Sequence, residues 1–286
     1  MNNYKPLKFQ KDSENRPLSI PFVFLIVTGL LYEFPKYIDY YDDLVHVYFF
    51  DVGQGDSILI KTPDRKLILT DGGNNNSVLY RISEVLPFWI KRIDYVVVSH
   101  PHADHIFGLI SLMESYEIGC LKYGGTGDTI SKVEEELRNT ISTESISVTD
   151  DCIGGVMKYY MPGGNDHTYN PNLKSLVSIY SYRDFDVLLT GDAEIPEQIK
   201  ALPSFSSDIE IIKVPHHGAK DSFYRPLLLA LKPEAAVISV GENNAYHLPS
   251  ASTIDGYEQL GIKVFRTDKD GSIEVISDGY LWSIVE

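Results

Sequence analysis

Four potential metal ligands stand within six residues of one another in the run SHPHADH. They are His100, His102, Asp104 and His105. Imidazole and carboxylate groups are common ligands of transition-metal ions, and a surface loop rarely collects so many of them. His100 and His102 could face one ion from an extended segment, while Asp104 and His105 could turn toward a second. The run therefore predicts a metal site.

Two later motifs could complete this site. Asp192 follows an apolar run at 186–190 (DVLLT), and a carboxylate at the end of a strand is well placed to bridge two ions. His216 and His217 follow another such run, in VPHHG. Because adjacent side chains diverge, we expect one of the two to bind metal and the other to support it or touch substrate. We favour His216 as the ligand.

Other polar residues could support the ligands or the substrate. Asp71, after KLILT, could orient a histidine or could be a plain turn residue before two glycines, and Asp56 in GQGD could play the same part. Lys220 and Ser222 could contact phosphate oxygens, with a solvated loop as the equal alternative. His247, in AYHLPS, is a candidate for protonating a leaving oxygen or for binding phosphate.

Apolar runs rich in Val, Ile and Leu recur along the chain, and most candidate ligands follow one of them directly. We expect strands at 45–60 (a pair around Gly53 and Gly55), 66–70, 95–99, 176–182, 186–190, 208–214, 235–240, 263–266 and 272–277. Helical spacing indicates helices at 106–116, 131–141 and 252–260. This alternation predicts an α/β protein with sheets inside and helices outside.

Composition limits the classes of function. The chain has 286 residues, 43% of them hydrophobic, and a formal net charge of −15. Such a balance argues against a protein that holds nucleic acid on a broad basic surface, so bound metal or a local basic patch would have to supply the positive charge. The only cysteines, Cys120 and Cys152, are expected to be buried thiols, or a single disulfide if the domain lies outside the cytoplasm.

The N-terminal region, residues 1–44, contains a hydrophobic segment. Residues 18–34 carry one charge, Glu33, and are about long enough for a short membrane span. The basic residues before the segment would place the domain at 45–286 outside the cytoplasm. We therefore expect a membrane anchor. A signal peptide and an arm packed on the domain are the alternatives, and the packed arm would fit a cytoplasmic protein.

Taken together, the motifs resemble those of the metallo-β-lactamase superfamily: DGG, HxHxDH, a strand ending in GD, and a late His. More narrowly, six segments in the same order are similar to the extracellular hydrolase domain of bacterial competence proteins of the ComEC/Rec2 type. These are FFDVGQGDSILI, SHPHADH, NLKSLVSI, LLTGDAE, VPHHGAKDS and the tail from NNAYHLPS to RTDKDGSIEVISDG. The similarity covers about residues 45–279.

The resemblance implies an αββα sandwich with two divalent ions at one edge of the sheets. It places the first ion on His100 and His102 and the second on Asp104, His105 and the late His, with Asp192 between them. Where lactamases carry a third histidine for the first ion, this chain has Asn172 and Ser175. The expected ions are therefore Zn²⁺ or a harder ion such as Mn²⁺.

The first functional hypothesis is a metal-dependent phosphodiesterase or nuclease acting on DNA through a metal-bound hydroxide, which Asp104 or Asp192 could orient. Nucleic acid, or another phosphodiester, would be the substrate, since the competence proteins are thought to degrade one DNA strand during uptake. Alternatives are a hydrolase of a small ester, lactone or nucleotide, and a non-catalytic metal-binding module. The competence proteins carry many membrane spans and this chain has room for one at most, so we expect that it is not itself a DNA channel.

Overall fold

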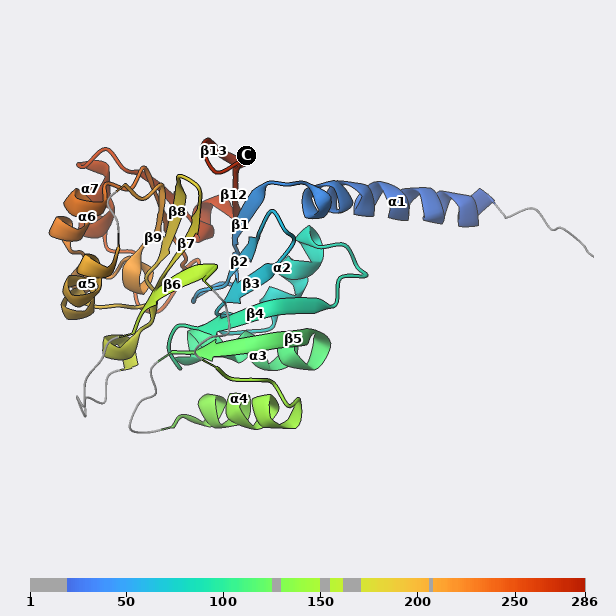
Figure 1. Ribbon diagram of the computed structural model, residues 1–286, viewed down its shortest axis with the longest axis horizontal. Helices are drawn as coiled ribbons and strands as arrows, with labels where there is room; N and C mark the ends of the chain where they lie inside the picture. The colour runs from blue at the N-terminus through green and yellow to red at the C-terminus, as the bar shows by residue number, and fades with distance from the viewer. Residues whose placement is uncertain (1–19, 125–129, 150–154, 162–170, 206–207, 286) are drawn as a thin grey trace, which may run out of the picture.

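Two β-sheets lie face to face in the computed structural model, and helices cover their outer faces (Figure 1). The structure describes residues 20–124, 130–149, 155–161, 171–205 and 208–285. The first sheet has seven strands in the order β13-β12-β1-β2-β3-β4-β5, and the second has six in the order β11-β10-β9-β8-β7-β6. The αββα sandwich expected from the sequence is confirmed.

The strands of the first sheet are β1 (Val45–Phe49), β2 (Ile58–Lys61), β3 (Leu67–Thr70), β4 (Arg92–Val98), β5 (Glu117–Tyr123), β12 (Ile273–Ser277) and β13 (Trp282–Val285). Those of the second are β6 (Met157–Tyr160), β7 (Val177–Tyr182), β8 (Phe185–Leu189), β9 (Ile211–Lys213), β10 (Ala235–Ile238) and β11 (Lys263–Arg266).

The helices are α1 (Ile20–Tyr41), α2 (Ser77–Val85), α3 (Ala103–Ser115), α4 (Lys132–Thr143), α5 (Ile195–Ala201), α6 (Arg225–Leu231), α7 (Ala251–Glu258) and α8 (Thr267–Asp270). Short 3₁₀ turns lie at η1 (Pro171–Lys174), η2 (Leu202–Ser204), η3 (Pro215–Gly218) and η4 (Lys220–Ser222).

Three hydrophobic layers hold the sandwich together. The middle layer joins the inner faces of the two sheets through residues such as Val47, Ile60 and Val187. One outer layer packs α2 and α3 on the first sheet, and the other packs α6 and α7 on the second. Strands of this kind are buried on both faces, which explains why they read as continuous apolar runs in the sequence.

Parallel pairing brings the ends of several strands to one edge. β3, β4 and β5 run parallel in the first sheet, and β8, β9, β10 and β11 run parallel in the second. The segments that follow β4, β8 and β9 carry the metal-ligand candidates of the sequence, and Asp71, a candidate for orienting a histidine, follows β3. The fold therefore gathers those candidates at the carboxyl edge of both sheets.

A glycine lets the loop after β1 approach this edge. Gly55 has a φ of +118°, and a Cβ atom there would stand 1.8 Å from the carbonyl oxygen of Asp104. No other residue type fits such a contact. The loop consequently lies directly against the start of α3, and Gln54 and Asp56 on either side of the glycine reach the site.

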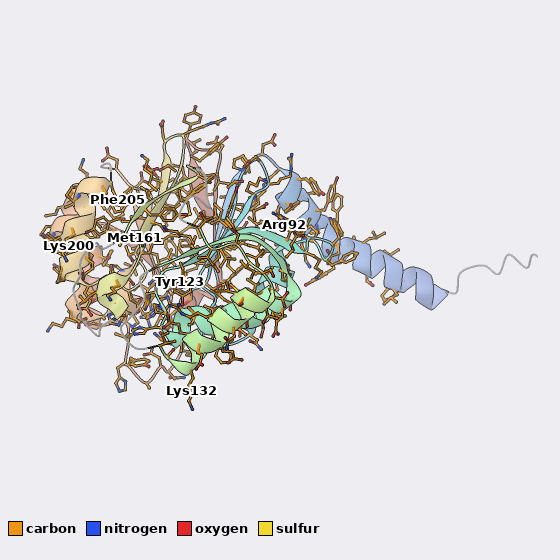
Figure 2. All side chains as sticks on the ribbon, turned by 60° about the horizontal axis from the view of Figure 1, so that its bottom comes forward. Arg92, Tyr123, Lys132, Met161, Lys200 and Phe205 are labelled. Atoms are coloured by element: carbon orange, nitrogen blue, oxygen red, sulfur yellow. The ribbon has the colours of Figure 1, made fainter. Side chains whose placement is uncertain are left out.

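Helix α4 adds a further layer over α3. Its start is capped by Ser131, whose side chain accepts a hydrogen bond from the Glu134 backbone amide. Glu134 is buried and pairs with Arg138, whose guanidinium lies 5.3 Å from the centre of the Tyr123 ring on β5. Figure 2 shows Tyr123 beside α4 and Lys132 at the start of that helix.

Helix α1 extends away from the sandwich (Figure 1). Phe24 and Leu31 are each 69% exposed, and only the last part of the helix contacts the domain, where the Lys36 ammonium donates to the Ser83 carbonyl at 2.8 Å. Within the described part of the hydrophobic segment, Glu33 also contacts the domain, where it accepts a hydrogen bond from the Phe88 amide at 3.0 Å. Among the helices that the structure describes, none has the length and apolar character that a membrane span requires.

Cys120, on β5, is disulfide-bonded, which is the second of the two alternatives considered for it and not the buried thiol. Cys152 lies outside the described residues.

A buried ionic cluster fastens the end of α1 to the first sheet. The His46 ring on β1 lies 2.6 Å from a Glu274 carboxylate oxygen and 2.9 Å from one of Asp42. Burial disfavours the charged imidazole, but hydrogen bonds to these carboxylates outweigh it and raise the pKa of His46 above its ordinary value. His46 thus has a structural role in β1, where it pairs with Glu274 and Asp42.

The cluster predicts a pH-dependent contribution to stability. A raised pKa means that charged His46 stabilises the fold below about pH 6.5, and that this contribution is lost as the pH rises through the folded-state value. His46→Gln should lower the free energy of unfolding by about 1.5 to 3 kcal/mol at about pH 6 and by much less at about pH 9. Urea unfolding of both proteins measures this, with the exposed His247→Gln as control. An equal loss at the two pH values would contradict it.

Candidate metal centre

The segments after three strands meet at the carboxyl edge and bring six metal-ligand candidates together. His100 and His102 follow β4, Asp104 and His105 lie in the first turn of α3, Asp192 follows β8, and η3 after β9 carries His217. Two groups result: His100, His102 and Asp192 form the first, and Asp104, His105 and His217 form the second. The ligand atoms within each group all lie within 4.8 Å of one another.

Asp192 faces both groups with different oxygens. Its Oδ2 lies 3.7 Å from His100 Nε2, whereas its Oδ1 lies 3.4 Å from His105 Nε2 and 3.6 Å from His217 Nε2. The carboxylate is almost fully buried, and Ser175 Oγ fixes its backbone by accepting from the Asp192 amide at 3.0 Å. This geometry allows one carboxylate to serve two cations.

Hydrogen bonds on the far side of two rings aim their free nitrogens at the centre. His105 Nδ1 lies 2.8 Å from Asp71 Oδ2, and His217 Nδ1 lies 2.8 Å from the Ser239 carbonyl oxygen. Because each Nδ1 is occupied by an outward hydrogen bond, Nε2 is the nitrogen that faces inward, where a metal ion would bind. Asp71 is itself held by the backbone amide and hydroxyl of Ser99. It thus orients a histidine, one of the two roles considered from the sequence.

The buried atoms at the centre are those that a divalent cation would satisfy. Within the described residues, His105 Nε2, His217 Nε2 and Asp192 Oδ1 have no hydrogen-bond partner, although all three are buried. Leaving such groups unpaired is costly, and each of them is a metal-ligand atom. The rings of His100 and His102 also face each other, with Nε2 of the first 3.0 Å from Nδ1 of the second. The donor set therefore fits divalent metal ions.

Electrostatics prepare these groups for cations. Burial, together with nearby His105, holds the pKa of His100 well below its ordinary value, so its imidazole is neutral. Burial alone would raise the pKa of Asp104, but the His217 imidazole, 3.4 Å away, and the charge of His105 hold it well below the usual range. For His105, burial is outweighed by Asp192 and Asp71, which raise its pKa well above normal. A metal ion must therefore displace a proton from His105.

A buried lysine lies beneath the site. The Lys213 ammonium, at the end of β9, lies 2.5 Å from Asp56 Oδ2 and 3.6 Å from Asp192 Oδ1, and donates to the Gly191 carbonyl at 2.9 Å. Burial opposes its charge, but Asp56 and Asp192 outweigh burial and raise its pKa. Sequence reasoning missed Lys213. The signal was a lone charged residue late in the apolar strand IIKV.

Asp56, His216 and Asn172 lie around the two groups. Asp56 Oδ1 is 3.5 Å from His217 Nδ1. His216 Nε2 is 3.9 Å from Asp192 Oδ2 and 3.4 Å from Asn172 Nδ2, which places this ring on the side of the first group. The structure thus places His217, rather than the favoured His216, with Asp104 and His105. Both residues have φ near +50°, and this turn buries His217 while leaving the His216 side chain 28% exposed.

Three residues singled out in the sequence lie elsewhere. Ser222 is buried, and its hydroxyl is committed to the carbonyl oxygens of Pro215 and Ala219, so it stabilises the loop instead of facing a phosphate. Lys220 is exposed on the solvated side, which was the alternative considered for it. His247 is also exposed, and it does not line the cavity at the site.

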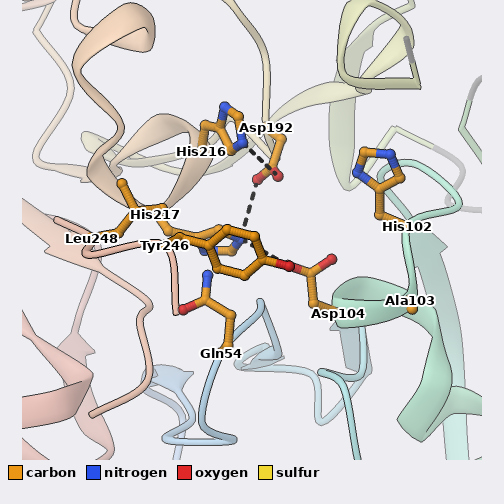
Figure 3. Close-up of a pocket in the computed structure, with 9 residues that line it drawn as sticks. All are labelled: Gln54, His102, Ala103, Asp104, Asp192, His216, His217, Tyr246 and Leu248. Carbon is orange, nitrogen blue, oxygen red and sulfur yellow. Dashed lines mark ion pairs between the residues drawn. The ribbon is translucent and has the colours of Figure 1, made fainter. Parts of the chain in front are cut away.

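A cavity of about 330 Å³ opens above the ligands (Figure 3). Its wall contains His102, Asp104, Asp192, His216 and His217, and also two residues that the sequence did not single out, Gln54 and Tyr246. Among the described residues that line it, none is a lysine or arginine.

Comparisons with known proteins agree with this arrangement. A family model described as the metallo-beta-lactamase superfamily matches residues 50–242. ComE operon protein 3 of Bacillus subtilis is 27% identical over 252 residues, which are 78% of this chain and 32% of the relative. Recombination protein 2 of Haemophilus influenzae is 26% identical over 229 residues, 79% of this chain and 28% of the relative. The chain thus spans about a third of the length of these curated relatives.

Solved structures show the same fold. A metal-dependent hydrolase of the beta-lactamase superfamily aligns with a TM-score of 0.50 and 16% identity, covering 85% of this chain and 99% of that one. A long form RNase Z from yeast aligns with a TM-score of 0.51 and 11% identity, covering 81% and 42%.

The different positions of His216 and His217 predict different effects on metal content. His217→Ala removes a member of the second group and should lower the metal bound per chain by about one ion after dialysis. His216→Ala should leave the content nearly unchanged. The two positions share the same unusual backbone conformation, so each variant controls for the strain in the other. Elemental analysis by mass spectrometry measures the content, and a greater loss in His216→Ala would reverse the assignment.

Proposed function

Because the chain belongs to the metallo-beta-lactamase superfamily, we propose that it is a metal-dependent phosphodiesterase whose substrate is nucleic acid, in the first place DNA. The observation that carries this proposal is the position of Asp192, whose two carboxylate oxygens face two separate groups of ligands. A pair of divalent ions a few ångströms apart is the arrangement used for phosphodiester cleavage in many enzymes.

In this proposal His100, His102 and Asp192 hold one ion, and Asp104, His105, His217 and the other oxygen of Asp192 hold the second. Zn²⁺ and Mn²⁺ both suit such imidazole and carboxylate ligands. When bound, the ions supply Lewis-acid stabilisation of the phosphate charge and lower the pKa of water.

The residues of the cavity wall divide the remaining tasks. Asp104 is ionised, lies 3.4 Å from His217 Nε2 and is partly exposed to the cavity, so it can accept a hydrogen bond from the attacking water and orient it. His216 also lines the cavity and is held beside Asn172. We therefore assign to His216, and no longer to His247, the donation of a proton to the leaving oxygen.

The names of the relatives support a nucleic acid substrate. One of them is Recombination protein 2, a further relative is described as Competence protein ComA of Neisseria gonorrhoeae, and one structural neighbour is an RNase. The cavity weighs against a nucleic acid substrate, because its described lining residues offer no basic side chain to a phosphate backbone. Binding of nucleic acid would then depend on the ions themselves.

The lack of basic side chains in the described lining favours a second candidate, a hydrolase of a small ester, lactone or nucleotide. A cavity of about 330 Å³ is in the size range of small-molecule sites. The two candidates share the metal chemistry and differ only in the size of the substrate. A non-catalytic module is disfavoured by the two groups of ligands, since a structural zinc site is normally closed by four ligands of one ion.

We also propose that the domain works outside the cytoplasm of a bacterium, in association with a membrane. The exposed apolar surface of α1 is unusual for a solvated helix, and the disulfide at Cys120 fits an oxidising compartment. The competence-protein relatives support the same context.

The function is tested by incubating the full chain with single-stranded DNA, duplex DNA and a small aryl phosphodiester, each with Mn²⁺, Zn²⁺ or a chelator. We expect cleavage of DNA that requires metal and falls by at least about 100-fold in the His102→Ala, Asp104→Ala double variant. Asp184→Ala, an exposed carboxylate away from the cavity, is the control. Cleavage of the small diester alone would favour the second candidate. Bound metal without any hydrolysis would refute both.

The location predicts an oxidised cysteine pair. Protein expressed with export to the bacterial periplasm and purified without reductant should resist alkylation by iodoacetamide until dithiothreitol is added, as judged by intact mass. Cytoplasmic expression of the same chain is the control. Two thiols that alkylate freely in the exported protein would remove this support for an extracytoplasmic domain.

A further inference from the structure

Tyr246 presents an aromatic ring that nothing in the described part of the chain covers. Its side chain is 70% exposed although it lines the cavity above the metal ligands. Figure 3 shows the ring lying across the cavity, close to Gln54 and Asp104. An exposed tyrosine at the mouth of a site offers a flat apolar face and a polar tip to whatever binds there.

The loop that carries this ring is held in place before any ligand arrives. The Asn244 side chain donates to the carbonyl oxygens of Gly241 and Leu248 at 3.0 and 2.7 Å, and its Oδ1 accepts from the amides of Tyr246 and Leu248 at 3.2 and 3.0 Å. Four hydrogen bonds from one side chain fix both ends of the loop. The ring is therefore presented at little cost in conformational entropy.

Tyr246 stands between two adjoining cavities. A second cavity of about 360 Å³ shares Gln54, Ala103, Asp104 and Tyr246 with the first, and it is lined further by Asn74 and Asn244. This outer cavity contains no metal ligand besides Asp104, and its other polar groups are side-chain amides. The described residues of its lining include no lysine or arginine that could hold a phosphate.

We propose that Tyr246 stacks on one nucleobase of a single-stranded nucleic acid, next to the phosphodiester that lies at the metal ligands. The proposal rests on the proposed function and names its substrate class. Aromatic stacking accepts every base, because each base has a π-face, and amides along the outer cavity suit the edges of a base. A paired base in a duplex has both faces covered by its neighbours, so a duplex would have to unstack before it could bind in this way.

The described lining residues of the two adjoining cavities include no lysine or arginine. Binding should depend on stacking and on the metal ions, with few phosphate contacts from lysine or arginine. Salt should therefore weaken binding of a single strand only slightly, in contrast to proteins that hold the backbone through many cationic side chains.

The test moves one abasic site along a short single-stranded DNA, one nucleotide at a time across the cleaved bond, with the metal-loaded full chain. Wild-type protein should lose roughly five- to 150-fold in kcat/KM when the base at one particular position is missing, and little at the others. Tyr246→Ala should cut the intact strand that much more slowly and should be indifferent to the abasic site, whereas Tyr246→Phe should behave like wild type. Tyr280→Ala, at another exposed tyrosine outside both cavities, is the matched control.

A uniform response to the abasic site in wild type and in Tyr246→Ala would overturn the stacking proposal while leaving the nuclease intact. If no strand is cut at all, the proposed function fails, and fluorescence anisotropy of a labelled hexanucleotide with Mn²⁺ decides about Tyr246 separately. Binding that weakens in Tyr246→Ala, stays normal in Tyr246→Phe and changes little with salt would support stacking. Equal binding by both variants, or none by wild type, would overturn it.

Discussion

The contact between the Lys213 ammonium and the Asp56 carboxylate is the interaction on which the rest of the site depends. Three buried carboxylates, Asp56, Asp71 and Asp192, each lie within 3.8 Å of a nitrogen of the His105 ring, and burying an unpaired charge is costly. The Lys213 ammonium pairs with the Asp56 carboxylate, and the His105 ring pairs with the Asp71 carboxylate. That division leaves the oxygens of Asp192 facing inward for cations. The ligand atoms of Asp56, His105 and Asp192 also lie within 4.8 Å of one another and form a third group. This group already has a cation beside it, the Lys213 ammonium.

The architecture follows from that division of charges. Each partner comes from a different strand end or loop, so the cluster exists only when both sheets are packed together at their carboxyl edge. Asp56 arrives on the loop after β1, Asp71 follows β3, Asp192 follows β8, and Lys213 ends β9. Since Gly55 allows the backbone of the first loop to touch α3, Asp56 reaches a lysine from the opposite sheet. Packing of the sandwich and assembly of the site are therefore one event, and metal binding should be linked to folding.

The sequence was most informative where the signal was local. His100, His102, Asp104 and His105 stand in one run, and the apolar strands predicted an α/β protein with its sheets inside, whereas the αββα sandwich was implied by the family resemblance. The identity of the later ligand depends on structure that no local pattern encodes. Two successive residues with positive φ at His216 and His217 decide which ring turns inward, and residues other than glycine rarely adopt that conformation. β5 went unpredicted because EIGCLKY lacks both a clear alternation and a long apolar run. Tyr246 and Lys213 were missed because exposure and burial of a single side chain are set by tertiary contacts.

The chain is acidic, and its proposed substrate is a polyanion. The two are compatible only if the bound ions make the local net charge at the metal ligands positive. Without the ions, the described residues of the cavity wall include the carboxylates of Asp104 and Asp192 and no lysine or arginine. These carboxylates would repel a phosphodiester. Two divalent ions would outweigh these two carboxylates and turn the same surface into a local cation site within an anionic protein. A net charge of −15 gives a polyanion little long-range attraction, so attraction for substrate would be concentrated where the ions bind. The specificity of such a site must come from uncharged contacts around the metal ligands, which is the role left to the aromatic ring and the amides of the cavity wall.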